Sequence, residues 1–147
     1  GEGVFYGKCA ELCGPSHALM DFKVKSLERK DFDAWIAAMQ ATEGQTADKE
    51  SSDVGEATFA NSCLSCHAIS GVGVSGALGP NLTTFGDRNR VAGFMDHTEE
   101  DVVKWIMDGM KPESKLKPGN LMTGKYNVSE AEAEAIAKYL MSLSVED

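Results

Sequence analysis

The sequence lacks several features that would place it in common classes of protein. None of its apolar runs approaches the ~20 residues that a membrane-spanning helix needs, and no basic segment followed by an apolar run marks a signal peptide. Basic residues are in the minority, because 14 Lys and Arg stand against 23 Asp and Glu, a net charge of −9. This negative charge argues against partners such as nucleic acid and against adhesion to anionic lipid headgroups.

Histidine and cysteine are also scarce, with three and four copies, and nearly all of them fall in two short motifs. These motifs are Cys9-x-x-x-Cys13-x-x-x-His17-x-x-Met20 and Cys63-Leu64-Ser65-Cys66-His67. No constellation of a catalytic acid, base or nucleophile is evident. We therefore do not expect the chain itself to transform a substrate, and we interpret the two motifs as metal or cofactor sites.

The second motif has the C-x-x-C-H form that attaches a c-type haem. The thiols of Cys63 and Cys66 would add to the haem vinyl groups, and the imidazole of His67 would become an axial ligand of the iron. C-x-x-C is also found in redox dithiols and as half of a zinc site. A thioredoxin-like dithiol needs a βαβ context, which this segment lacks. Zinc needs further ligands, and only the first motif contains other cysteines.

A haem in an electron carrier needs a second strong axial ligand, and Met122 is the best candidate among seven methionines. It ends the segment 117–122, in which Pro118 and Gly119 can turn a loop back toward the haem. A thioether ligand there would raise the haem potential. Four other methionines lie in helical apolar patterns and are predicted to pack in the core: Met95, Met107, Met110 and Met141. His97 lies in an acid-rich stretch and is predicted to be an exposed surface residue.

Composition divides the chain into a first structured region, residues 1–41, a linker, residues 42–53, and a second structured region, residues 54–147. Residues 4–6 resemble the middle of a strand, so we expect the chain to begin inside a larger protein. Residues 20–25 alternate between apolar and charged side chains, which predicts a half-buried strand, and Asp31 opens a short helical stretch. Residues 42–53 are polar and acidic, which predicts a flexible linker.

The region 54–147 is predicted to be mainly α-helical. Three helices begin with a capping residue, at Asp53, Thr98 and Ser129, and the last two are followed after three residues by the acidic partner of a capping box. Gly- and Pro-rich loops are expected over 71–80 and 111–124. Residues 1–41 contain five basic and six acidic side chains. The rest of the chain therefore contains nine basic and seventeen acidic side chains, a net charge of −8.

Residues 54–147 resemble a class I cytochrome c. Gly55 and Phe59 resemble positions of the N-terminal helix that leads into the haem motif, and Ile136, Tyr139 and Leu140 resemble the C-terminal helix that crosses it. A glycine at such a crossing lets two helices approach closely. Trp105 resembles the helix residue that packs near a haem propionate.

The same resemblance implies the cofactor and its ligands. Gly79-Pro80-Asn81-Leu82 is similar to the loop whose proline carbonyl accepts the N–H of the proximal histidine. The implied cofactor is a covalent haem c, attached through Cys63 and Cys66 and held by His67 and Met122 on the iron. The carbonyl of Pro80 would then orient His67 and increase its basicity.

Cys9, Cys13, His17 and Met20 form a set of soft and borderline metal ligands. Zinc is the generic interpretation, but methionine is a poor zinc ligand, and two thiolates, one imidazole and a weak thioether suit copper electron transfer better. Residues 7–20 closely resemble the dinuclear CuA loop of cytochrome c oxidase subunit II. That resemblance implies that Cys9 and Cys13 bridge two coppers, that His17 and Met20 each bind one, and that the Glu11 carbonyl is a weak further ligand.

The CuA family supplies one more histidine from an upstream strand, whereas His67 and His97 both lie downstream in this chain. The resemblance therefore implies a copper site that is incomplete within these residues. The implied fold is mainly α, a class I cytochrome c preceded by a strand, loop and helix fragment of a cupredoxin-like CuA domain.

The order of CuA loop, linker and cytochrome resembles subunit II of the caa-type terminal oxidases. It implies electron transfer from a cytochrome or quinol-oxidising complex through haem c to CuA. The implied complex contains oxidase subunit I, reduces oxygen and translocates protons. It implies a position on the extracytoplasmic face of the membrane, anchored only through upstream segments. Two alternatives remain: a free-standing soluble cytochrome shuttle, and a structural zinc or disulfide module that uses all four cysteines.

Overall fold

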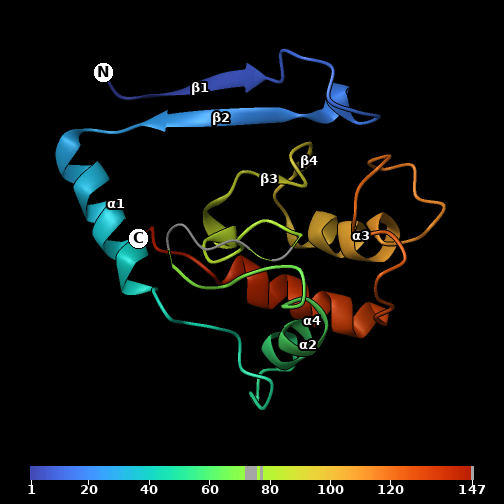
Figure 1. The fold of residues 1–147 in the computed structure, drawn as a ribbon. Coiled ribbons are helices and arrows are strands. Elements are labelled where there is room, and N and C mark those ends of the chain that lie inside the picture. The colour runs from blue at the N-terminus through green and yellow to red at the C-terminus, as the bar shows by residue number, and fades with distance from the viewer. Residues whose placement is uncertain (72–75, 77, 147) are drawn as a thin grey trace.

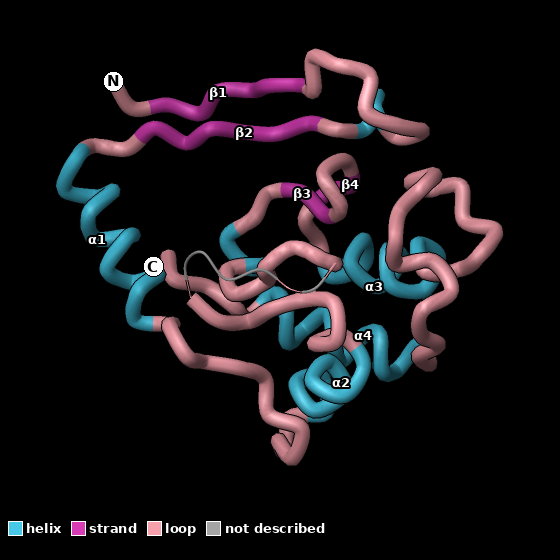
Figure 2. Tube along the Cα trace, viewed as in Figure 1, coloured by secondary structure: helices cyan, strands magenta, loops and turns pink. Residues whose placement is uncertain are grey.

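The computed structural model describes residues 1–71, 76 and 78–146, so part of the expected loop at 71–80 lies outside the described residues. A two-stranded hairpin and a helix come first, and three further helices pack together in the remainder of the chain (Figure 1). Figure 2 shows that long connections without helix or strand join these elements. Among the described residues, none of the helices has both the length and the apolar character needed to cross a membrane.

The hairpin consists of β1 (Gly3–Lys8) and β2 (Asp21–Ser26), which pair antiparallel from Gly3 opposite Ser26 to Lys8 opposite Asp21. Both predicted strands are therefore confirmed. The predicted burial of one face is wrong, however, because Phe22 and Val24 keep 54% and 53% of their surface exposed. The physical reason is that two strands alone bury little apolar surface unless a third strand or a helix covers them.

Helix α1 (Arg29–Ala41) follows β2 and begins two residues before the expected start at Asp31. Glu28 precedes it and makes no side-chain cap bond, so no capping residue marks this boundary. Residues 42–53, all of them described, form no helix or strand, as expected of a connecting segment. The small side chain of Ala47 is nevertheless only 4% exposed and packs in the core of the following region.

The prediction that the second region is mainly helical is confirmed by α2 (Val54–Ser62), α3 (Glu99–Gly109) and α4 (Glu130–Met141). A short pair, β3 (Arg90–Val91) and β4 (Met95–Asp96), lies between α2 and α3. Asp53, Thr98 and Ser129 cap the three helices, as predicted, by accepting a hydrogen bond from the backbone N–H three residues on. At Ser129 both hydrogen bonds of a capping box form. At Thr98 only the bond that the Thr98 side chain accepts is present.

Helices α2 and α4 cross at Gly55, which confirms the predicted close approach. A Cβ atom at Gly55 would clash with the carbonyl group of Ala135 and would lie 2.9 Å from Cβ of Tyr139. Beside the crossing, the rings of Phe59 and Tyr139 pack with their centroids 5.8 Å apart. Phe59 and Ile136 are each only 1% exposed, so this crossing is the centre of the core.

The four methionines predicted to pack in the core do so, although Met95 lies in β4 and not in the helical pattern expected for it. Met95 is buried in the core cluster, and three partly buried side chains pack against it: Met107, Met110 and Met141. His97, predicted to be a surface residue rather than a ligand, is only partly exposed. Its Nε2 lies 2.9 Å from the carbonyl oxygen of Phe85, and its ring centroid lies 5.1 Å from that of Phe85. The acid-rich stretch after His97 is exposed, but the imidazole itself packs against Phe85.

Candidate metal centres

One large cavity brings together the residues that the sequence singles out for a haem. Its volume is about 1230 Å³, and it continues from the helices of the second region to the hairpin and α1, where Val4, Phe32 and Trp35 line it. Five of the candidate residues line it: Cys63, Cys66, His67, Pro80 and Met122. Much of the remaining wall is apolar and comes from α2, α3 and α4, among them Phe59, Ile106 and Leu140. The cavity is therefore large and apolar enough for a flat macrocycle.

The C-x-x-C-H segment forms a tight turn directly after α2. Cys63 caps the helix, and its N–H donates to the carbonyl of Phe59 at 2.7 Å. The N–H groups of Cys66 and His67 both donate back to the carbonyl of Cys63, at 3.0 and 2.9 Å. Burial, and to a smaller degree the charge of Cys66, raise the pKa of the Cys63 thiol to about 11. One turn of backbone thus presents two thiols and an imidazole to the same cavity.

The imidazole of His67 is fixed through one of its two nitrogens. Nδ1 lies 2.9 Å from the carbonyl oxygen of Pro80. Because a carbonyl can only accept a hydrogen bond, Nδ1 must carry the proton, which leaves the lone pair of Nε2 free to bind a metal. Gly79 packs close to the ring, since a Cβ atom there would lie 2.6 Å from Cε1 of His67. This arrangement sets both the tautomer and the orientation of the ligand.

Met122 lies in a loop between α3 and α4 and lines the same cavity. Its N–H donates to Oδ1 of Asn120 at 2.9 Å, and Gly119 adopts the left-handed φ of +79° that the turn requires. Beyond the loop, the hydroxyl of Tyr126 lies 2.9 Å from Oγ of Ser65. Because Ser65 lies inside the C-x-x-C-H motif, this hydrogen bond joins the two segments that flank the cavity.

Two basic residues of the cavity wall were missed by sequence reasoning. The guanidinium of Arg88 donates to the carbonyl of Asn81 and lies over the ring of Phe85, and burial lowers its pKa. The ammonium group of Lys117 donates to the carbonyl of Ala92 at 2.6 Å, and burial lowers its pKa too. Neither belongs to a motif, and the acidic balance of the region hides them. No local pattern in the sequence marks either residue as part of the cavity wall.

Trp105 also lines the cavity, as the resemblance implied for a residue near the cofactor. Its ring packs edge-on against Phe94, with centroids 6.2 Å apart. Gly109, one turn further along α3, is tightly packed against the same indole, because a Cβ there would lie 2.8 Å from Cε3. The position of Trp105 is thus fixed by packing on two sides.

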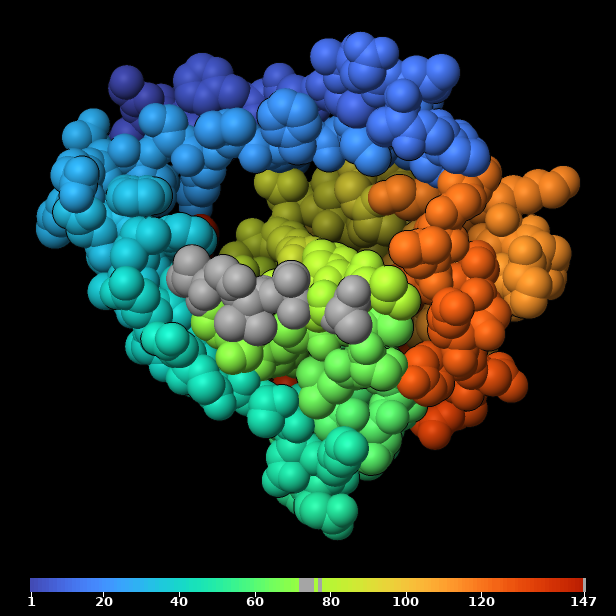
Figure 3. Space-filling view, viewed as in Figure 1, coloured from blue at the N-terminus to red at the C-terminus, as the bar shows by residue number. Residues whose placement is uncertain are grey.

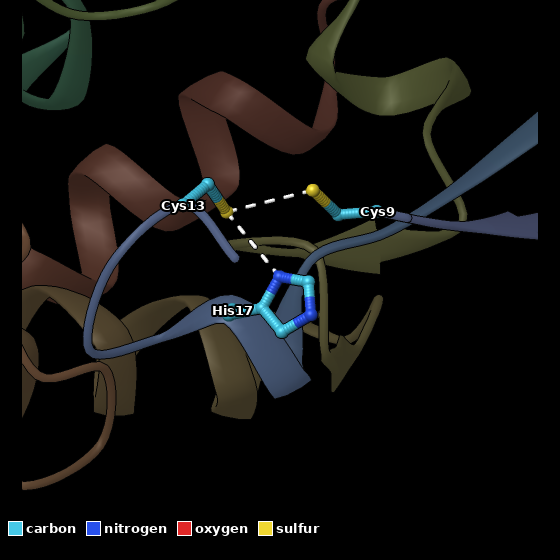
Figure 4. Close-up of side chains that lie close together, drawn as sticks. All are labelled: Cys9, Cys13 and His17. Carbon is cyan, nitrogen blue, oxygen red and sulfur yellow. Dashed lines mark hydrogen bonds between the residues drawn. The ribbon is translucent and has the colours of Figure 1, made fainter. Parts of the chain in front are cut away.

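The first motif lies at the tip of the hairpin, where the chain turns from β1 to β2 (Figure 4). Residues 9–20 are called the thiol loop below. The sulfur of Cys13 lies 3.5 Å from Sγ of Cys9, 3.5 Å from Nδ1 of His17 and 3.6 Å from Sδ of Met20. Sγ of Cys9 lies 3.1 Å from the carbonyl oxygen of Glu11. All five predicted donors therefore gather at one point.

The backbone of the thiol loop explains this convergence. The N–H of Cys9 donates to the carbonyl of Met20 at 3.0 Å and closes the loop at its base. Gly14, with φ of +132°, reverses the chain, and His17 lies in a short 3₁₀ turn, His17–Leu19. A hydrogen bond with the Cys9 thiol is the main cause that raises the pKa of Cys13. A metal must displace these protons, because thiolates are the ligands.

The structure brings no second imidazole to this cluster from the residues that it describes. The ligand atoms of Cys9, Cys13 and His17 lie within 4.8 Å of one another. His67 is directed at Pro80 and His97 at Phe85, both in the other region. Thiolate, imidazole and thioether donors fit copper, but the set falls one imidazole short of the CuA pattern described above.

Comparisons with known families match each region separately. Residues 52–144 match the family described as cytochrome c, and residues 1–27 match the periplasmic domain of cytochrome c oxidase subunit II. The chain is 51% identical over 148 residues to cytochrome c oxidase subunit 2 of Bacillus sp. (strain PS3) and covers 40% of that protein. It is 45% identical over 148 residues to the protein of the same name from Bacillus subtilis (strain 168), again covering 40% of it.

These alignments include 98% and 97% of the present chain, so both metal motifs and the segment between them lie in one aligned stretch. The chain nevertheless spans less than half the length of the relatives that it matches.

Proposed function

The chain belongs to the cytochrome c family, and from this premise we propose that it relays electrons in a caa-type terminal oxidase. Electrons would enter from a cytochrome or a quinol-oxidising complex, pass to the haem region, and leave through the copper site of the same subunit. The observation that carries the proposal is the presence of two ligand sets on one chain. One is the cavity with Cys63, Cys66 and His67, and the other is the thiol loop.

The residues of the cavity fit a haem c. Cys63 and Cys66 are the proposed attachment points, Nε2 of His67 the proximal ligand and Met122 the distal ligand. A haem held in this way supplies one-electron exchange at its iron. The carbonyl of Pro80 keeps the imidazole of His67 in a single orientation and increases its basicity. An apolar wall and a thioether ligand would both raise the potential of a haem bound there.

Arg88 and Lys117 are proposed to balance the two propionates of the haem. Both side chains line the cavity, and burial disfavours their charged forms, as the lowered pKa values indicate. A carboxylate nearby would reverse this effect, because an opposite charge favours the charged form. Trp105 lies in the same wall and would cover the propionate side.

The thiol loop is proposed to carry the CuA ligands Cys9, Cys13, His17 and Met20, with the Glu11 carbonyl as a weak fifth donor. The remaining imidazole would come from a part of the subunit II domain that residues 1–27 do not include. The proposed partners are oxidase subunit I, which reduces oxygen and translocates protons, and the electron donor. The proposed location is the extracytoplasmic face of the membrane.

The test is spectroscopy on the full-length protein in its purified oxidase. A reduced c-type α-band that survives denaturation and solvent extraction is expected, together with a mixed-valence copper spectrum. Cys63→Ala with Cys66→Ala should abolish covalent haem and keep copper, and Cys9→Ala with Cys13→Ala should do the opposite. A haem band without copper would favour the soluble shuttle. Bound zinc with no haem band would favour the structural module and overturn the proposal.

A further inference from the structure

The thiol loop does not extend into solvent but lies against the loop that carries Met122. The hydroxyl of Ser16 donates to the carbonyl of Pro118 at 2.6 Å, a contact across 102 positions of the sequence. Next to it, the position that a Cβ of Gly119 would occupy lies 3.4 Å from the ring of Pro15. Residues 117–122 are called the Met122 loop below. In Figure 3 the blue surface of the thiol loop meets the orange surface of this part of the chain.

The turn between β3 and β4 braces both loops. A Cβ at Gly93 would lie 3.7 Å from the carbonyl oxygen of Leu19 and 3.9 Å from Nζ of Lys117. Lys117, the first residue of the Met122 loop, donates to the carbonyl of Ala92 in the same turn. At the other end of β2, Lys25 forms an ion pair of 2.7 Å with Glu146. The hairpin is therefore held at both ends, and Figure 3 shows an opening between these contacts.

One donor of the thiol loop reaches the cavity that the candidate haem ligands line. Met20, a donor of the thiol loop, lines the same cavity as His67 and Met122. The contact between Ser16 and Pro118 also joins the thiol loop to the loop that carries Met122. This contact is neutral on both sides, so its strength should not depend on ionic strength, unlike the lysine-mediated docking of a diffusing cytochrome.

Ser16 has no local task that would explain its hydroxyl. It stands at the N-cap position of the 3₁₀ turn but makes no side-chain cap bond with it. Its hydroxyl instead donates to the carbonyl of Pro118. Gly119 follows Pro118 with a φ of +79°, a conformation that favours glycine and leaves room for Pro15. The two loops are complementary in shape as well as in hydrogen bonding.

We propose that the Met122 loop is an intramolecular docking surface for the thiol loop, and that the hydrogen bond from Ser16 to Pro118 holds the two proposed metal centres in position for electron exchange. This inference rests on the proposed function for its redox role. The exchange would pass one electron from a haem held by His67 and Met122 to copper held by the thiol loop, and no proton would be transferred. Because both loops belong to one chain, a weak contact suffices, since the tether keeps their effective concentration high.

The test compares Ser16→Ala with Ser26→Ala in the full-length oxidase. Ser26 is a matched control, because its hydroxyl also donates to a backbone carbonyl, that of Gly1 at 3.1 Å, but at the far end of the hairpin. Ser16→Ala should slow electron transfer from photoreduced haem c to copper by about 2- to 10-fold, the loss expected from one neutral hydrogen bond. Ser26→Ala should leave the rate unchanged, and Ser16→Thr should restore it.

A second measurement does not depend on the metals. Hydrogen exchange of the backbone amides of residues 119–122 should accelerate in Ser16→Ala and stay at the wild-type level in Ser26→Ala. Unchanged exchange in Ser16→Ala would overturn the docking surface, whatever the spectra show. Loss of the copper spectrum in Ser16→Ala would also overturn it, because the serine would then support the copper site itself. Wild-type protein without either metal spectrum would instead overturn the proposed function.

Discussion

At the scale of the residue, the candidate haem site depends on a few atoms whose partners are backbone groups. The sequence motif predicts Cys63, Cys66 and His67, and the resemblance adds Pro80, whose carbonyl indeed lies 2.9 Å from Nδ1 of His67. Arg88, Lys117 and the bond between Ser65 and Tyr126 could not be predicted in this way. Each depends on which loops meet in space, and a local pattern in the sequence carries no such information.

The distal ligand provides the first test. Replacing Met122 with Ala should leave the haem covalently attached, because both thiols remain, but should open the iron to water and small ligands. The potential should fall, since a thioether raises it, and the sulfur-to-iron charge-transfer band should vanish. Met107→Ala is the control, because that methionine packs against the core. Survival of the band in Met122→Ala would assign another residue as ligand.

The hydrogen bond between Tyr126 and Ser65 provides the second test. Its loss in Tyr126→Phe should let the Met122 side of the cavity move away from the C-x-x-C-H turn. Imidazole should then bind ferric haem about 2- to 10-fold more tightly, the range for one neutral hydrogen bond. Tyr6→Phe is the control, since Tyr6 is 79% exposed on the hairpin. Equal imidazole affinity in both variants would show that this bond does not restrain Met122.

At the scale of the element, helix starts are the best predicted features and burial the worst. Asp53, Thr98 and Ser129 cap their helices because a capping bond is local and spans only three residues. The exposed face of β2 and the buried Ala47 depend on what packs against each segment. Alternation and composition cannot supply that information, because they describe a segment without its neighbours.

The crossing of α2 and α4 gives a stability prediction. Gly55→Val would force its new side chain against Ala135 and Tyr139, and overpacking of this kind costs about 1–3 kcal/mol. Thermal unfolding of the haem-bound protein should report a lower midpoint. Ala131→Val, on the exposed side of α4, is the control because it introduces the same β-branched residue. It should lower the midpoint only by a small fraction of the shift in Gly55→Val. Equal midpoints for wild type and Gly55→Val would show that the helices do not approach closely.

The capping box of α4 gives a pH prediction. Hydrogen bonds from the backbone and side chain of Ser129 lower the pKa of Glu132. A group with a lowered pKa stabilises the fold above its unfolded pKa, and this contribution disappears as the pH falls through the folded value. Glu132→Gln should therefore lower the unfolding midpoint at neutral pH and converge with wild type in acid. The control Glu134→Gln, exposed on the same helix, should show no such convergence, and a pH-independent difference for Glu132→Gln would contradict the argument.

At the scale of the whole molecule, charge is unevenly distributed in a way that the total hides. The region after residue 41 has a net charge of −8, yet four of its basic residues line the central cavity: Arg88, Arg90, Lys117 and Lys125. Net charge predicted no nucleic acid partner, but it could not locate these cations. The contact between the thiol loop and the Met122 loop was equally beyond prediction, because it joins segments about a hundred residues apart.

The copper site is the test that belongs to the whole molecule. Cys9, Cys13, His17 and Met20 converge, but two bridging thiolates with one imidazole leave one copper without its histidine. The match to the subunit II domain covers only residues 1–27, and the faces of β1 and β2 stay largely exposed. The ligands therefore lack the surrounding contacts that hold a site against loss of metal.

Copper titrated into this 147-residue chain should consequently not give a mixed-valence purple spectrum that survives mild chelation, and Cys9 and Cys13 should remain free or become oxidised. The full-length protein, handled in the same buffer, is the positive control and should give that spectrum. The haem α-band should be the same in both, because its proposed ligands all lie between Cys63 and Met122. A chelation-stable purple centre in the 147-residue chain would mean that these residues supply a further ligand, and His97, whose imidazole contacts the carbonyl of Phe85 in this structure, would be the first position to replace.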